Sequence, residues 1–350
     1  MMNDKSIRFF KLVRDFLTVY LPDQRAVSFN TIKSYRECLN QLLNYICGRC
    51  EVGLGKLSFE YLSRETVEGY LEHLESKRNC CVSTRNHRLA CIRSFVKYSG
   101  IRDVSVQALV NDLGSIPLKK TAKSAVIKFF SESALKTILE QPDPRRKKEL
   151  RNLFFMILMY DTGARNQEML DLSLGDTHFD GHSPYAVITG KGGKTRLVPV
   201  MPKTVDHFRK YMSIFHPKPT TTSSNLFYTE RKGNRFAMSP DNTARFIKKY
   251  GVAAREINQE VPESLHPHTF RHSRSMHLYR SGMPMVLLAE WLGHAQLSST
   301  LIYANADTEM KREAIEKATS QLNSLVSVDT AYLEWEDDEA LIRQLYGLSQ

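Results

Sequence analysis

The sequence lacks any apolar run long enough to cross a membrane. A membrane helix needs about 18 or more consecutive apolar residues, and no stretch of this chain reaches that length. The first ten residues place Asp4 and Lys5 before a short apolar stretch and contain no small-residue cleavage site. We therefore expect no membrane contact, no secretory signal and a cytoplasmic location.

The sequence motifs of common metal and cofactor sites are also incomplete. All cysteines lie in the first hundred residues, at Cys38, Cys47, Cys50, Cys80, Cys81 and Cys91, and they form no second spaced pair of the kind that zinc requires. His268 and His272 have i, i+4 spacing, but Thr269 stands where a zinc protease has glutamate. The segment 190–195 resembles a phosphate-binding loop, but Ile188 occupies the position of its first glycine. We expect reduced thiols, no metal and no cofactor.

Acidic residues are in deficit over most of the chain. Lys and Arg number 49 against 38 Asp and Glu, which gives a net charge of +11. The excess is +7 in residues 1–120 and +9 in residues 121–325, whereas residues 326–350 carry −5. Two basic bodies and an acidic tail favour a polyanionic partner, of which nucleic acid is the commonest.

The first hundred residues show no strand pattern. Apolar residues recur at helical spacing in four segments, near 9–20, 32–46, 67–74 and 89–96. Pro22 and Gly100 are expected to end the first and fourth helices, and Ser28 or Asn30 to cap the second. The pattern predicts a bundle of four or five helices.

Two sets of polar side chains in this half suit contacts with DNA. The predicted fourth helix carries a second face of Arg85, Asn86, Arg88, Arg93 and Lys97. The segment 116–130 has one proline and no clear period, and includes Lys119, Lys120 and Lys123. Such residues contact phosphates and groove edges, so we predict that both sets bind DNA.

The chain after residue 130 has the pattern of a mixed domain with both helices and strands. Helices are predicted near 131–141, 147–160, 165–172, 203–215, 240–257, 268–281, 284–292 and 308–324. Two short strands, 185–190 and 195–200, flank a glycine-rich turn. The fold class is therefore mainly α (α+β): a helical domain at 1–115, a basic linker at 116–130, a mixed domain with a small antiparallel sheet at 131–325 and the tail at 326–350.

Several short sequence motifs in the second domain resemble those of the tyrosine recombinase (phage integrase) family. They are TGAR-x-x-E from 162, GKGGK-x-RLVP from 190, PHTFRHS from 267, LGH from 292 and a tyrosine nine residues later. The resemblance maps the family's signature onto Arg165, Lys191, His268, Arg271, His294 and Tyr303. Phe270 stands where the family commonly has leucine. The match covers about residues 8–325, and its first part resembles the family's core-binding (SAM-like) domain.

The resemblance assigns a role to each residue, and the chemistry of phosphodiester cleavage agrees. Arg165 and Arg271 would clamp the phosphate with bidentate donors, because charge builds on its non-bridging oxygens. Tyr303 would be the nucleophile, and His268 its base, because a free tyrosine has a pKa of about 10.

The other members would support that step. Lys191 would protonate the leaving 5′-oxygen, with Lys194 as the second candidate on the same tight turn. His294 would bind a phosphate oxygen, and Glu168 would hold the Arg165 region in place.

The resemblance implies site-specific recombination of double-stranded DNA by a homotetramer, through a 3′-phosphotyrosyl intermediate and a Holliday junction. The compact form resembles chromosome-resolution recombinases and mobile-element integrases alike. We favour integration or excision of a mobile element, with chromosome-dimer resolution, a type IB topoisomerase and a silent DNA-binding protein as alternatives. The need for an accessory DNA-bending protein stays open, as does the target site. Residues 326–350 have apolar residues at near-helical spacing, and predict either a solvated tail or a segment that docks on a neighbouring subunit.

Overall fold

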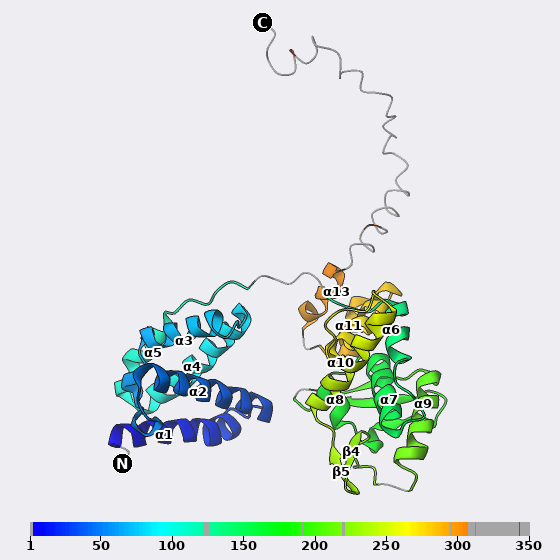
Figure 1. The fold of residues 1–350 in the computed structure, drawn as a ribbon, viewed down its shortest axis with the longest axis horizontal. Helices are drawn as coiled ribbons and strands as arrows, with labels where there is room; N and C mark the ends of the chain where they lie inside the picture. Colours follow the sequence, from blue (N-terminus) through cyan, green and yellow to red (C-terminus); the bar gives the residue numbers. More distant parts are fainter. Residues whose placement is uncertain are drawn as a thin grey trace. The chain divides into compact units, whose positions relative to one another are not determined.

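The computed structural model describes residues 3–121, 127–190, 192–218, 221–294, 296–306, 312 and 343. The chain forms two compact units, Met1–Lys123 and Ser124–Gln350 (Figure 1). The predicted fold class is confirmed, because helices dominate and the strands form small antiparallel sheets. Within the described ranges, no helix has the length and apolar character to cross a membrane.

The first unit is helical. Its α-helices are α1 (Asp4–Asp15), α2 (Phe29–Cys50), α3 (Arg64–Ser76), α4 (Val82–Arg102) and α5 (Gln107–Gly114). The Oγ atoms of Ser28 and Ser63 accept hydrogen bonds from backbone N–H groups in the first turns of α2 and α3, which satisfies donors that a helix start leaves open. Phe9, Phe16 and Phe95 meet edge to face in the core.

Two predicted helix ends are wrong. The chain does not stop at Pro22, because α1 continues into a π-helix, η1 (Phe16–Gln24), that includes this proline. A π turn holds an extra residue, which gives the ring room that an α-helix denies it. Gly100 lies inside α4, where a Cβ atom would come within 2.7 Å of Val110 Cγ2. The glycine therefore allows the close approach of α5.

The second unit is built around α7. Its helices are α6 (Glu132–Leu139), α7 (Lys147–Thr162), α8 (Asn166–Asp171), α9 (Pro202–Phe215), α10 (Pro240–Ile257), α11 (Pro267–Arg280), α12 (Met285–Leu292) and α13 (Leu301–Ala306). Most of α7 is buried, and α6, α8, α9 and α11 contact it (Figure 1). The predicted helix at 308–324 lies outside the described residues, apart from residue 312.

Strands β1 (Thr177–His178), β2 (Tyr185–Thr189) and β3 (Thr195–Pro199) form an antiparallel sheet in that order. The two predicted strands are confirmed as β2 and β3, which pair from Tyr185 with Pro199 to Thr189 with Thr195. A second hairpin, β4 (Tyr228–Arg231) and β5 (Asn234–Ala237), was not predicted. Its turn places Lys232 and Gly233 at positive φ, a geometry that favours glycine.

Candidate active site

The turn between α7 and α8 places Arg165. Gly163 ends α7 in the left-handed region with φ +57°, and Trp291 of α12 packs so closely that a Cβ atom there would lie 2.5 Å from its ring. Arg165 follows as the N-cap residue of α8, directly before the helix, with about a third of its side chain exposed. The glycine thus gives the chain a sharp turn and lets α12 approach the arginine.

Glu168 lies beneath Arg165 and is almost fully buried. Its Oε2 atom accepts the backbone N–H of Arg165 at 2.9 Å, and Oε1 accepts from Arg165 Nη1 at 2.7 Å. Arg196 Nη2 of β3 donates to Oε2 at 2.7 Å. Burial opposes the charged carboxylate, but the hydrogen bonds from Arg196 and Arg165 outweigh it and hold the pKa of Glu168 below its usual value.

Helix α11 supplies two of the predicted residues, and Pro267 opens it as its first residue. Arg271 is buried and donates from Nη1 to the Gly163 carbonyl at 2.6 Å and from Nη2 to the Leu292 carbonyl at 2.7 Å. Gly163 lies two residues before Arg165, and Leu292 lies two residues before His294. Arg271 therefore ties together the chain ends that carry two other predicted residues.

His294 follows the end of α12. Gly293 closes that helix at φ +64°, and His294 Nδ1 is 2.7 Å from Oγ1 of the buried Thr300. Burial, followed by the charges of Arg271, Arg165 and Arg196, lowers the pKa of His294 to about 4. The imidazole is therefore neutral at pH 7, and the bond to Thr300 leaves Nε2 for another partner.

Tyr303 lies on α13 and is only 1% exposed. Its ring packs with Met276, Leu288 and Leu292, and its hydroxyl is 3.1 Å from Nδ1 of His272. Burial raises the pKa of Tyr303, although Ser275, Arg271 and Arg165 act against this rise. The hydroxyl is protonated at pH 7 and requires a base before it can act as a nucleophile.

On α11, His272 lies against this tyrosine, and His268 lies next to His272. The ring centroids of His268 and His272 are 6.5 Å apart, and those of His272 and Tyr303 are 5.9 Å apart. Burial, then the neighbouring histidines and Arg271, lowers the pKa of His272 to about 4. Burial and the same cationic surroundings also lower the pKa of His268. Neutral imidazoles of this kind are able to accept a proton.

A cavity of about 980 Å³ lies on one side of the site, and Tyr303, His268 and Arg271 are not among the residues that line it. Arg165, Lys194, Arg196 and His294 line it, together with the apolar side of α12. The turn between β2 and β3 holds Gly192 and Gly193 at positive φ and is closed by the bond from the Gly190 N–H to the Lys194 carbonyl, 2.8 Å. The predicted Lys191 lies on this turn but outside the described residues.

Two arginines on the predicted DNA-facing side of α4 form hydrogen bonds within the unit. Arg85 is buried and donates to the Pro117 carbonyl at 2.9 Å. Arg93 donates to the carbonyls of Leu113, Gly114 and Ile116. The two arginines thus hold the end of α5 and the segment that follows it.

The other predicted DNA contacts differ in how accessible they are. Asn86 bonds the backbone of Lys119, and Arg88 Nη1 is 3.4 Å from the Ser34 carbonyl. Lys97, Lys119 and Lys120 are exposed, and Lys119 pairs with Glu75 at 2.7 Å. The predicted Lys123 and the tail at 326–350, apart from residue 343, lie outside the described residues.

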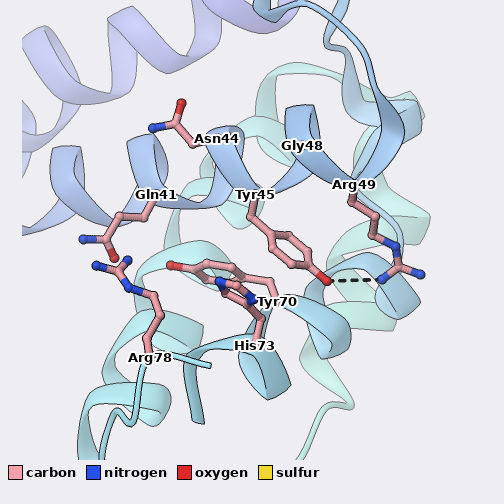
Figure 2. Close-up of a pocket in the computed structure, with 8 residues that line it drawn as sticks. All are labelled: Gln41, Asn44, Tyr45, Gly48, Arg49, Tyr70, His73 and Arg78. Atoms are coloured by element: carbon pink, nitrogen blue, oxygen red, sulfur yellow. Dashed lines mark hydrogen bonds between the residues drawn. The ribbon is translucent and has the colours of Figure 1, made fainter. Parts of the chain in front are cut away.

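A separate pocket of about 580 Å³ lies between α2 and α3 (Figure 2). Arg49 donates to the Tyr45 hydroxyl at 3.4 Å, and this pair covers Gly69, where a Cβ atom would meet both side chains. Arg49 also pairs with Glu65. None of the predicted catalytic residues lines this pocket.

Sequence reasoning missed two members of the site. Arg196 stands inside a predicted strand, and its sequence position alone indicated no role. The signal was its alternation with the buried Val198, which places both on the face of β3 opposite Leu197. His272 was weighed only as a metal ligand, and its position one residue after Arg271 gave no sign that it faces Tyr303. The signal that could have found it is the i, i+4 spacing from His268 on one helix face.

Comparison with known proteins agrees with this geometry. The model of the phage integrase family matches residues 128–310, and that of the phage integrase N-terminal SAM-like domain matches residues 15–100. The tyrosine recombinase XerA of Pyrococcus horikoshii is 31% identical over 74% of this chain and 85% of its own. The putative integrase/recombinase y4rC of Sinorhizobium fredii is 26% identical over 88% of this chain and 91% of its own.

Solved structures share the fold. The XerH site-specific recombinase in its post-cleavage complex with the palindromic difH substrate has a TM-score of 0.64 and 18% identity, and the match covers 90% of each chain. The Tn1549 transposon integrase with circular intermediate DNA has a TM-score of 0.60 and 18% identity, over 90% of this chain and 99% of its own. The chain belongs to the phage integrase family and is a tyrosine site-specific recombinase.

Proposed function

We propose that this recombinase cleaves double-stranded DNA with Tyr303 and forms a 3′-phosphotyrosyl link and a free 5′-hydroxyl. One observation carries the proposal: Arg271 bonds the Gly163 and Leu292 carbonyls, and so gathers Arg165, His294 and the helix that packs on Tyr303. Residues from four separate segments meet there. Such convergence suits a site that neutralises a phosphate and presents a nucleophile.

Each side chain has a physical reason for its role. Burial lowers the pKa of Arg271 to about 10, with Arg165 as the next cause, so the Arg271 guanidinium stays charged at pH 7. The planar guanidiniums of Arg165 and Arg271 suit the phosphate oxygens. His268 is neutral and suits the base that takes the Tyr303 proton. His294 Nε2 suits a phosphate oxygen, and the lysine of the hairpin turn, Lys191 or Lys194, suits the acid for the 5′-oxygen.

Recombination needs further partners. The phosphotyrosyl ester keeps the bond energy, so a second DNA end reverses the step without a nucleotide. Two rounds of exchange by a homotetramer would pass through a Holliday junction. Exposed Lys97, Lys119 and Lys120 suit phosphate contacts around the cleavage site. Integration and excision of a mobile element are favoured by the likeness to y4rC and to the Tn1549 integrase, although XerA and XerH leave chromosome-dimer resolution as the second candidate.

The test uses a nicked suicide duplex that carries the DNA ends flanking the gene. A covalent adduct on a denaturing gel, lost in Tyr303→Phe, is the expected result. An adduct of equal yield in Tyr303→Phe would reject the nucleophile. Binding without an adduct would instead favour a silent DNA-binding protein.

A two-site assay separates the remaining alternatives. Exchange between two cognate duplexes is expected, with no relaxation of a supercoiled plasmid that lacks the site. Relaxation of any plasmid, without exchange, would favour a type IB topoisomerase.

A further inference from the structure

Arg196 lies in the site but has none of the roles assigned above. It lies on β3, five residues after Lys191, with 11% of its side chain exposed. Its Nη2 atom donates to Glu168 Oε2 at 2.7 Å, and Glu168 also holds the backbone and the guanidinium of Arg165. One carboxylate therefore links the strand of the hairpin to the first phosphate-binding arginine.

Two glycines make room for this link. A Cβ atom on Gly190 would lie 3.3 Å from Glu168 Oε1 and 3.6 Å from Arg196 Nη1. A Cβ atom on Gly293, which has φ +64°, would lie 3.0 Å from Arg196 Nη1. Gly190 directly precedes Lys191, and Gly293 directly precedes His294. The Arg196 guanidinium thus fills the space between the start of the hairpin turn and the end of α12.

The strand pairing of the hairpin links the position of Arg196 to that of the turn. Arg196 is opposite Ile188, one step from the last pair of the ladder, Thr189 with Thr195. The turn itself closes through bonds from the Gly190 N–H to the Lys194 carbonyl and from the Gly193 N–H to the Gly190 carbonyl. The loop beyond the last pair is short, so fixing Arg196 fixes where the turn begins and ends. The turn carries both lysines that suit the acid.

We propose that Arg196 is a positioning residue that anchors the hairpin to Glu168 and to the end of α12, so that the turn lysine can protonate the leaving 5′-oxygen. The inference rests on the function proposed above. In the step concerned, Tyr303 Oη bonds to phosphorus and its proton passes to the base. The bond from phosphorus to the 5′-oxygen breaks, and that oxygen takes a proton from the lysine Nζ.

A sulfur substitution distinguishes this role from phosphate binding. In a 5′-bridging phosphorothiolate, sulfur replaces the leaving 5′-oxygen. A thiol has a pKa of about 8.5, far below that of an alcohol, so a thiolate leaves without an acid. A protein whose only defect is in delivering that proton should recover on this substrate, whereas one that has lost a phosphate ligand should not.

The experiment compares single-turnover cleavage of oxygen and sulfur versions of the suicide duplex. Arg196→Gln should slow cleavage of the oxygen substrate by about 10- to 100-fold and bring the sulfur substrate to within about threefold of the unmodified protein. Lys191→Ala or Lys194→Ala, whichever removes the acid, should show the same rescue. Arg165→Ala should stay slow on both substrates. Arg209→Gln is the matched control, because Arg209 is exposed on α9 and pairs with Asp206.

The outcomes separate two kinds of failure. Arg196→Gln that is equally slow on both substrates, while folded and bound to DNA, would make Arg196 a phosphate ligand and overturn the proposal. If Arg196→Gln does not fold, Arg196→Lys serves instead, since it keeps the charge but loses the planar fork and should show a smaller, equally rescued defect. An unmodified protein that cleaves neither substrate would reject the proposed function as well. If the unmodified protein forms the adduct but the sulfur substrate rescues neither Lys191→Ala nor Lys194→Ala, a turn lysine is not the acid. The proposed role of Arg196 is then rejected as well.

Discussion

Replacing His272 should loosen Tyr303 before any DNA is bound. The tyrosine ring is buried among apolar side chains, and its hydroxyl lies 3.1 Å from Nδ1 of His272. His272→Leu keeps an apolar side chain of similar reach and removes the hydrogen bond. His272→Asn is the matched control, because its amide places a polar atom near the position of Nδ1.

The expected size follows from the burial of the hydroxyl. A buried polar group that loses its partner costs about 1 to 3 kcal/mol, and a typical net hydrogen bond contributes about 1 kcal/mol. A cost of 1.4 kcal/mol changes an equilibrium tenfold. We therefore expect the opening of α13 to become about 5- to 140-fold more populated in His272→Leu. His272→Asn should change it less than about twofold.

Amide hydrogen exchange measures this opening. The N–H of Tyr303 donates to the Thr300 carbonyl at 3.0 Å, and its protection reports on the first turn of α13. Protection should fall in His272→Leu while the amides of α7 remain unchanged. Equal protection of residues 300–303 in the unmodified protein and in His272→Leu would refute the view that this bond holds the tyrosine.

Three further outcomes follow from the structure. The folded-state pKa of about 4 for His272 and His294 lies below that of an unfolded histidine, about 6.5, so their contribution is present above pH 6.5 and is lost as pH falls. Urea denaturation should show about 1 to 2 kcal/mol less stability per histidine at pH 5 than at pH 7, a loss that His294→Gln reduces; a pH-independent midpoint would contradict it. Gly100→Ala should lower stability by about 1 to 3 kcal/mol against Val110, whereas Gly48→Ala, with nothing within 4 Å, should raise it by up to about 1 kcal/mol. Affinity for cognate DNA should fall steeply with salt in filter binding, and a flat response would contradict the charge argument.

The sequence predicted the elements of the fold well where local signals agree. Helix α10 begins after Ser239 at Pro240 and ends at Ile257, as the capping residue and the apolar period indicate. The predicted ends at Pro22 and Gly100 failed for a different reason. A proline or a glycine disfavours an α-helix locally, but the chain passes Pro22 as a π-helix, and at Gly100 the packing of Val110 of α5 against the helix decides the outcome.

In the site too, local sequence signals predicted some features, and packing decided others. Spacing and motif placed Arg165, His268, Arg271, His294 and Tyr303 on their elements, and the structure brings those elements together through Arg271. Spacing could not show that Arg85 and Arg93 bond carbonyls at the end of α5 and just beyond it. A basic helix face has the same sequence pattern whether its side chains face solvent or bond the backbone. The same limit hid Arg196, whose partner Glu168 lies 28 residues earlier.

The site divides charge and proton transfer between different side chains. Its positive charge resides on Arg165, Arg196 and Arg271, which stay protonated at physiological pH. Burial, followed by nearby cationic groups that include Arg271 and Arg165, lowers the pKa of both His268 and His294. A cationic His268 could not accept the proton of Tyr303, so the arginines that suit phosphate binding also hold the base in its working form. A negative phosphate in the site would offset part of that field and bring the histidine pKa values upward, which would make His268 a stronger base when DNA is bound than when it is absent.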